Sequence, residues 1–129
     1  MKLNYATVGS NDLPRAVAFY QALLGDAGWT VIMEHDNGGR IWRLGSSLFA
    51  VMVPRDGNAA TVGNGTMIGF ALESVQAVAD FHAKALSLGG TDEGAPGNRG
   101  SEASPVHFGY FRDPDGNKLC GYSISSNAA

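Results

Sequence analysis

The chain has 129 residues, of which 44% are hydrophobic and 16% are charged, with a formal net charge of −3. This length and composition predict one globular domain over residues 1–129 and exclude a disordered chain. No apolar run is long enough to cross a bilayer, so no membrane partner is expected. The absence of a basic cluster argues against a nucleic-acid partner, while one cysteine and no hydrophobic leader segment favour a cytoplasmic protein.

The first part of the chain predicts a strand, a helix and three further strands. A short apolar strand begins at Tyr5 and leads into a helix. The side chains of Asn11 and Asp12 can accept hydrogen bonds from the free backbone amides at the start of this helix, and Pro14 fits its first turn. Apolar residues at three- and four-residue spacing predict that this helix packs one face onto a sheet. The strand-like segments that follow are residues 29–35, 40–45 and 48–53.

A weak internal repeat indicates a second module of the same kind. At an offset of 62 residues, Met67 corresponds to Tyr5, and the apolar positions of the two following helices match. Residues 54–64 are rich in Gly, Asn and Ala, so they are expected to link the modules, which cover about residues 1–53 and 65–124.

The second module has one poorly marked strand and two clear ones. Ser74 is expected to cap its helix, and a Gly-Gly pair to end it. A strand begins near Thr91, whereas residues 94–104 are predicted to form a polar loop. Residues 106–112 and 118–124 are the clear strands, so the predicted order is βαβββ–βαβββ.

The most distinctive motif is Asp-Pro-Asp-Gly-Asn at residues 113–117, between the last two strands. Proline presets φ for a turn, Asp and Asn satisfy backbone groups locally, and Gly accepts a positive φ, so a β-hairpin is predicted. Followed by Lys118, a leucine and Cys120, the motif resembles the closing hairpin of the vicinal-oxygen-chelate superfamily. This superfamily contains glyoxalase I, extradiol dioxygenases, fosfomycin-resistance proteins and bleomycin-binding proteins.

The resemblance covers residues 3–124 and includes Asn-Asp-Leu-Pro-Arg-Ala-Val-Ala-Phe-Tyr at residues 11–20. It implies an α+β fold in which two βαβββ modules form an open, curved, mixed β-sheet half-barrel that binds ligands in its concavity. It also implies a homodimer, because sites in this family are often shared between subunits.

The resemblance further implies where a divalent metal ion would bind. The two histidines and two glutamates of the family's metalloenzymes correspond here to Tyr5, Phe49, Met67 and Cys120. Phe49 cannot coordinate a metal, a thioether suits soft ions, and one thiol does not make a site. The sequence therefore predicts no metal and no cofactor, with a divalent Zn, Ni or Fe ion as the disfavoured alternative.

Side-chain alternation predicts the wall of a ligand-binding cleft instead. If the hairpin pairs Tyr110 with Cys120, then Phe108 and Tyr122 share their face and His107 points away. The same side chains can alternatively fill the barrel as core. The expected cleft residues are mostly aromatic: Tyr5, Thr7, Phe49, Met67, Phe108, Tyr110, Cys120 and Tyr122.

Other reactive side chains favour structural roles, and no catalytic residue is identified. His35 is expected in solvent and His82 on an amphipathic helix face, while Cys120 is expected to be a buried, inert thiol. Three arginines can hold an anionic group of a ligand or be solvated on the surface: Arg40, Arg43 and Arg99.

These features favour a metal-free protein, similar to glyoxalase and bleomycin-resistance proteins, that binds a small hydrophobic or aromatic molecule. One alternative is a divalent-metal-dependent lyase, isomerase or dioxygenase of the glyoxalase I type. A second alternative is a non-catalytic regulatory or interaction protein. Whether the protein is an enzyme stays open at this point.

Overall fold

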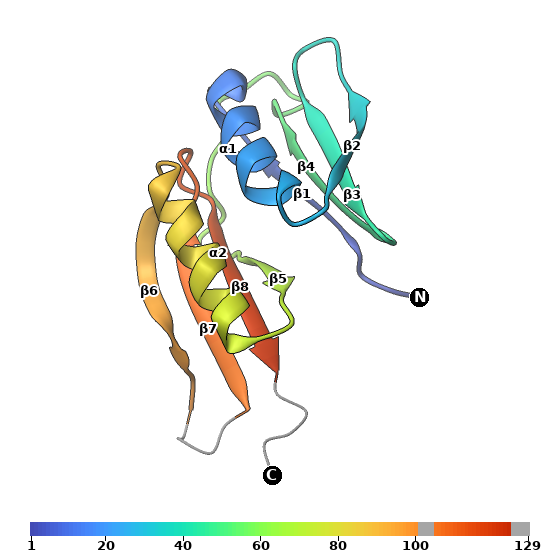
Figure 1. The fold of residues 1–129 in the computed structure, drawn as a ribbon. Coiled ribbons are helices and arrows are strands. Elements are labelled where there is room, and N and C mark those ends of the chain that lie inside the picture. Colours follow the sequence, from blue (N-terminus) through green and yellow to red (C-terminus); the bar gives the residue numbers. More distant parts are fainter. Residues whose placement is uncertain (101–104, 125–129) are drawn as a thin grey trace. The chain divides into compact units, whose positions relative to one another are not determined.

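The computed structural model describes residues 1–100 and 105–124 (Figure 1). These residues contain two helices and eight strands in the order βαβββ–βαβββ, which confirms the predicted α+β class and the duplicated module. The chain divides into two compact units, Met1–Asn64 and Gly65–Ala129. No helix of the described part is long and apolar enough to span a membrane.

The first unit is a helix packed on a four-stranded mixed sheet. The strand order is β1-β4-β3-β2, with β1 parallel to β4 and the other neighbours antiparallel. Its elements are β1 (Tyr5–Gly9), α1 (Leu13–Gly25), β2 (Thr30–Glu34), β3 (Arg40–Leu44) and β4 (Ser47–Met52).

Local chemistry explains where α1 begins and which face it buries. The Asp12 side chain accepts a hydrogen bond from the Arg15 backbone amide at 3.2 Å, and a proline stands in the first turn, as predicted. The apolar stripe of the helix is buried, and the Tyr20 ring packs against Trp42 and Phe49 of the sheet. This aromatic cluster is the centre of the first core.

The second unit repeats this arrangement at the predicted offset. Its strand order is β5-β8-β7-β6, again with one parallel and two antiparallel pairs. The helices have equal lengths, and α2 begins and ends 62 residues after α1. The elements are β5 (Ile68–Ala71), α2 (Val75–Ser87), β6 (Thr91–Asn98), β7 (Val106–Arg112) and β8 (Lys118–Ile124).

The ends of α2 follow the predicted signals. Ser74 Oγ accepts from the Ala77 amide at 3.0 Å, and Gly89 follows the last turn with a φ of +105°, a left-handed conformation that glycine adopts without strain. The helix packs closely on its sheet at Gly121, where a Cβ atom would lie 2.7 Å from the Phe81 ring. The second core therefore depends on a small residue beneath α2.

One predicted boundary was wrong. Residues 94–98, expected in a loop, belong to β6 and pair with β7; bulges between Asp92 and Gly94 and between Gly94 and Gly97 remove the two-residue alternation that marks a strand. The remainder of that expected loop includes residues 101–104, which lie outside the described residues. The second unit begins at residue 65, where the predicted linker ends, and within that segment the Asn11 side chain bonds both backbone groups of Ala60, at 3.0 and 2.7 Å.

Candidate functional site

The closing hairpin sets the register of the candidate site. The Asp113 amide donates to the Asn117 carbonyl at 2.9 Å, which closes a tight loop at the position of the Asp-Pro-Asp-Gly-Asn motif. Through this loop Tyr110 pairs with Cys120, and Phe108 pairs with Tyr122, as predicted. Paired residues of neighbouring strands share a face, so these four side chains point to the same side of the sheet.

Three aromatic rings form a stacked row on that side, and we call Phe108, Tyr110 and Tyr122 the aromatic face. Phe108 is the middle ring, with centroids 5.6 Å from Tyr110 and 5.3 Å from Tyr122 and interplanar angles of 8° and 18°. All three rings are partly exposed, whereas Phe111, on the opposite side of β7, is fully buried. Because Phe111 packs on Phe81 of α2, the aromatic face is the side of the sheet that the helix does not cover.

Glycines on both flanking strands make room for these rings. At Gly69 on β5 a Cβ atom would lie 3.2 Å from the Tyr122 ring, and at Gly94 on β6 it would lie 2.9 Å from the Tyr110 ring. The rings therefore extend over the glycine backbone of the two edge strands. Aromatic covering of edge glycines is also a way to stabilise a sheet, so the row has a structural role even without a ligand.

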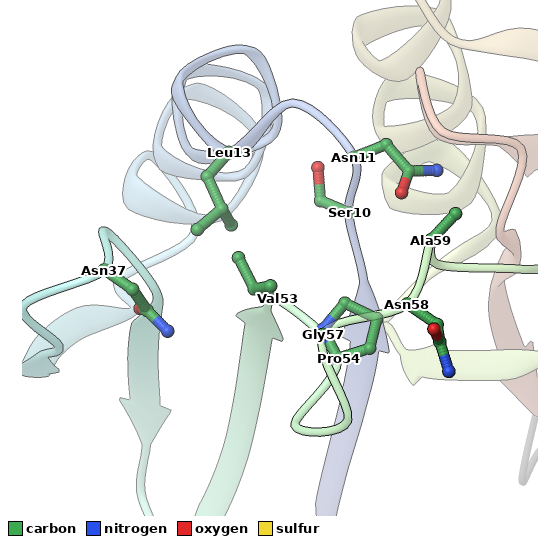
Figure 2. Close-up of a pocket in the computed structure, with 9 residues that line it drawn as sticks. All are labelled: Ser10, Asn11, Leu13, Asn37, Val53, Pro54, Gly57, Asn58 and Ala59. Atoms are coloured by element: carbon green, nitrogen blue, oxygen red, sulfur yellow. The ribbon is translucent and has the colours of Figure 1, made fainter.

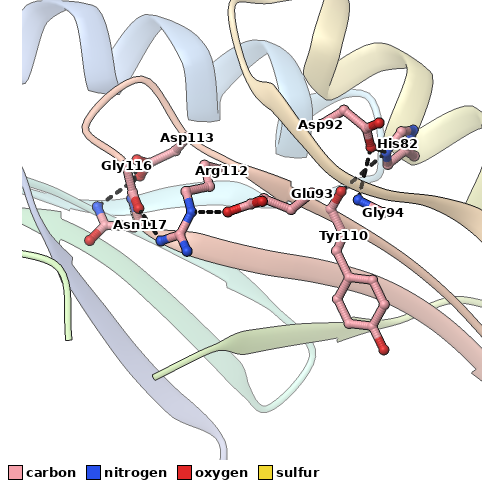
Figure 3. Close-up of polar contacts among 9 residues, drawn as sticks. All are labelled: His82, Asp92, Glu93, Gly94, Tyr110, Arg112, Asp113, Gly116 and Asn117. Carbon is pink, nitrogen blue, oxygen red and sulfur yellow. Dashed lines mark hydrogen bonds and ion pairs between the residues drawn. The ribbon is translucent and has the colours of Figure 1, made fainter. Parts of the chain in front are cut away.

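Two positively charged side chains lie over the end ring of the row. The Arg99 guanidinium carbon is 5.1 Å and the Lys118 ammonium 5.3 Å from the Tyr110 ring centroid, both within cation–π range. Among the described residues neither has a carboxylate partner, whereas Arg112 forms an ion pair with Glu93 (Figure 3). The aromatic face is thus bordered by two positive charges that no carboxylate of residues 1–100 and 105–124 neutralises.

The other two arginines considered from the sequence lie in the first unit. Arg40 is 3.4 Å from the Glu34 carboxylate and also donates to the Gly38 carbonyl at 2.8 Å. Arg43 is exposed on β3, and His35 is exposed as predicted. Of the three arginines proposed to hold an anion, Arg99 belongs to the same unit as the aromatic face and lies over Tyr110.

Cys120 faces Tyr110 but has the properties of an inert thiol. It is fully buried, and burial raises the pKa of its thiol to about 11, an effect that the nearby Lys118 charge only partly offsets. At neutral pH the thiol is therefore protonated, and the thiolate is the reactive form. Its role on this face is to pack.

The residues at the positions that hold a metal ion in the resembling enzymes are poorly suited to bind a divalent ion. Phe49 was wrongly expected in the cleft: the register pairs it with Ala6 and Trp42, and its ring lies 4.8 Å from that of Tyr20 beneath α1. Its 1% exposure makes it a core residue. Within residues 1–100 and 105–124, no three His, Cys, Asp or Glu side chains gather closely enough to hold a metal ion. The described residues therefore supply no set of donors that fits a divalent ion.

The three other expected cleft residues are exposed. Ala6 of β1 pairs with Phe49 and shares its face of the sheet, whereas Tyr5 and Thr7 point to the opposite face. Both are exposed, Tyr5 at 50%. Met67 precedes β5 and is 42% exposed. Their side chains are therefore accessible, while the rings that pack together are those of the aromatic face.

A polar contact that the sequence analysis missed connects α2 to β6 and β7. His82, expected on a helix face, is buried, and its Nε2 lies 3.0 Å from Asp92 Oδ1 and 3.1 Å from the Tyr110 carbonyl oxygen (Figure 3). Both neighbours are acceptors, so Nε2 carries a proton and donates. The contact holds the Tyr110 backbone from the side of the sheet that α2 covers, while the Tyr110 ring extends to the aromatic face on the other side. No spacing pattern reveals it, because it depends on the bulges in β6.

Replacing Asp92 by asparagine is expected to lower the thermal stability near neutral pH and to have little effect in acid. The Gly94 amide, at 2.9 Å, and His82 hold the pKa of the Asp92 carboxyl below its usual value of about 3.9. A lowered folded-state pKa stabilises the fold above the unfolded pKa, and this contribution is lost as the pH falls through the folded value. The melting temperatures of wild type and Asp92→Asn, measured from neutral pH to below pH 4, should therefore differ near neutral pH and become equal at the acid end. Asp36→Asn, in an exposed turn, is the control; parallel curves for wild type and Asp92→Asn contradict the prediction.

A separate pocket of about 320 Å³ lies in the first unit (Figure 2). It lies between the start of α1 and the loop after β4, and none of the expected cleft residues borders it. Its walls are small, polar or aliphatic and carry no titratable group, so it offers neither stacking nor charge. The lining residues are Ser10, Asn11, Leu13, Asn37, Val53, Pro54, Gly57, Asn58 and Ala59.

Comparisons with known proteins agree with the geometry of the fold. Residues 2–120 match the family model of the Glyoxalase/Bleomycin resistance protein/Dioxygenase superfamily. A glyoxalase/bleomycin resistance protein from Albidiferax ferrireducens T118 is similar in structure, with a TM-score of 0.84, 35% identity and coverage of 95% of this chain and 98% of that chain. A search among curated proteins gave no match.

More distant structures share the fold alone. A glyoxalase-related enzyme from Fulvimarina pelagi has a TM-score of 0.74 and 17% identity, over 95% of this chain and 88% of that chain. A lactoylglutathione lyase from Agrobacterium tumefaciens has a TM-score of 0.71 and 16% identity, over 95% and 92% of the respective chains.

Proposed function

The chain belongs to the Glyoxalase/Bleomycin resistance protein/Dioxygenase superfamily, and we propose that it binds a small aromatic molecule on its aromatic face without the help of a metal ion. The observation that carries this proposal is the row of three partly exposed, nearly parallel rings on the side of the second sheet that α2 leaves uncovered. Stacked aromatic side chains offer a flat ligand both apolar contact and favourable ring geometry. The phenol groups of Tyr110 and Tyr122 add hydrogen-bonding ability at either end.

The donor set supports binding without a metal. A divalent ion of the kind used by this superfamily needs imidazole and carboxylate groups, but the positions that the sequence resemblance assigns to these ligands hold Tyr5, Phe49, Met67 and Cys120. Phe49 is in the core, and the single thiol of Cys120 does not make a site by itself. A metal-dependent lyase or dioxygenase is therefore the weaker candidate. Homodimerisation and a cytoplasmic location stay predictions from the sequence.

The test uses the full chain after treatment with EDTA and two fluorescent probes that share one ring system, 2-naphthoate and 2-naphthamide. At least one probe is expected to bind in calorimetry, with the same affinity whether or not EDTA was used. Phe108→Leu removes the middle ring but keeps an aliphatic side chain, so it should weaken binding by about fivefold, because an aromatic contact contributes about 1 kcal/mol.

The matched control is His107→Leu, which changes the neighbouring residue on the opposite face of β7. It should leave the affinity unchanged. The proposal fails if neither probe binds, or if binding disappears with EDTA and returns when Zn²⁺ or Ni²⁺ is added. Circular dichroism of each variant verifies that a weaker affinity does not come from unfolding.

A further inference from the structure

The geometry points to an anionic ligand: we infer that the molecule on the aromatic face is an aromatic anion, such as an aryl carboxylate, whose charged group is held by Lys118 and Arg99. This inference rests on the proposed function and specifies the ligand class for the same face. It is argued from the charges around Tyr110 and from how Arg99 is positioned.

Two cations beside one ring are an unusual concentration of positive charge in a protein of net charge −3. Arg99 and Lys118 both lie within 5.3 Å of the Tyr110 ring centroid, and the ring itself carries no charge that could neutralise them. Two like charges beside the same ring raise each other's energy, and an anion that contacts either of them lowers it. The site therefore favours a ligand that brings a negative charge.

Two other arginines of this chain each have a carboxylate partner. Arg112, on the same face of β7 as Tyr110, is paired with Glu93, and Arg40 is paired with Glu34. In the described part of the chain no carboxylate performs this function for Lys118 or Arg99. A positive charge bordering an apolar surface without a protein counter-ion is a recognition element for an anion.

Arg99 is also positioned before any ligand binds. Its Nη2 donates to the Ala95 carbonyl at 2.8 Å, so the guanidinium is folded back against β6. The guanidinium also lies close to Gly97, where a Cβ atom would be 3.0 Å from Arg99 Nη1. A guanidinium has five N–H donors, and those not used by the backbone remain for a carboxylate. Less side-chain entropy is lost on binding when the arginine is already held.

The experiment compares 2-naphthoate with 2-naphthamide, which have the same ring but differ in charge. Calorimetry at low ionic strength should give an affinity for naphthoate at least tenfold higher than for naphthamide. Lys118→Met and Arg99→Met keep most of the side-chain length and remove the charge, so each should reduce this preference severalfold. Added salt should reduce the preference in the wild type, because it screens exposed charges. Lys84→Met, on α2, is the matched control and should keep the preference.

The outcomes separate this inference from the proposed function. Equal, Phe108-dependent affinities for acid and amide overturn the anion inference but leave binding by the aromatic face intact. Absence of binding by both probes overturns the proposed function and this inference with it. If Lys118→Met instead changes the molar mass measured by light scattering and leaves the naphthoate affinity unchanged, the cations serve contact with a second copy of the chain, which also overturns the inference.

Discussion

Replacing Phe49 by alanine is expected to lower the free energy of unfolding by about 3–5 kcal/mol, the range typical of a phenylalanine truncated in a core. Phe49 is 1% exposed, and its ring is 4.8 Å from Tyr20 and 6.4 Å from Trp42. The truncation leaves a cavity between α1 and the sheet, because three packed aromatic rings collapse only partially around a missing one. Urea unfolding followed by tryptophan fluorescence measures the loss of stability as a lower midpoint concentration of urea.

The same variant tests the corrected position of Phe49. Where Phe49→Ala is still folded, its affinity for the naphthalene probes should equal that of the wild type, because the ring does not lie on the aromatic face. Leu48→Ala is the matched control, since Leu48 precedes Phe49 on β4, points to the opposite side and is only half-buried. It should cost much less stability. A stable Phe49→Ala variant that has lost the probes contradicts the assignment of Phe49 to the core.

Replacing Asp113 by alanine is expected to cost about 3 kcal/mol of stability. Asp113 is 2% exposed, and its carboxylate accepts three hydrogen bonds at 2.9 Å: from the backbone amides of Asp115 and Asn117 and from the Asn117 side chain. Alanine leaves these donors without the acceptor inside a tight loop, and each buried donor that loses its partner costs about 1–3 kcal/mol. Urea unfolding again provides the measurement.

Asp113→Asn is the control, because it removes only one of the two carboxylate oxygens that accept hydrogen bonds. Asparagine keeps one oxygen for the two backbone amides but places an amide nitrogen near the Asn117 side chain, so it should lose less stability than alanine does. Because the loop sets the pairing of Tyr110 with Cys120, the folded alanine variant should also bind the naphthalene probes more weakly. Equal stabilities of the two variants would show that the hydrogen bonds of this carboxylate contribute little.

Residue patterns predicted most of the fold because they act over short distances. The caps Asp12 and Ser74 and the glycine after α2 specify helix ends within one turn of the chain. In the hairpin loop, Gly116 adopts a φ of +93° between residues that bond each other locally. For the same reason the pairing of Tyr110 with Cys120, and with it the aromatic face, followed from loop length alone.

β6 and Phe49 required information that short patterns do not contain. The bulges of β6 interrupt its alternation, so only its pairing with β7 identifies residues 94–98 as a strand. β4 is apolar at successive positions, and Ala50 and Val51 are as buried as Phe49. An apolar run without alternation does not indicate which side a given residue faces.

The amino-acid sequence by itself determined the family, the duplicated βαβββ order and the register of the closing hairpin, because caps, turns and alternation are encoded in neighbouring residues. The tertiary structure alone decided which face of β4 lies beneath α1, which arginine borders the aromatic face, and that His82 meets Asp92. These contacts join residues on different elements, and their geometry depends on strand register and helix packing that no local pattern specifies.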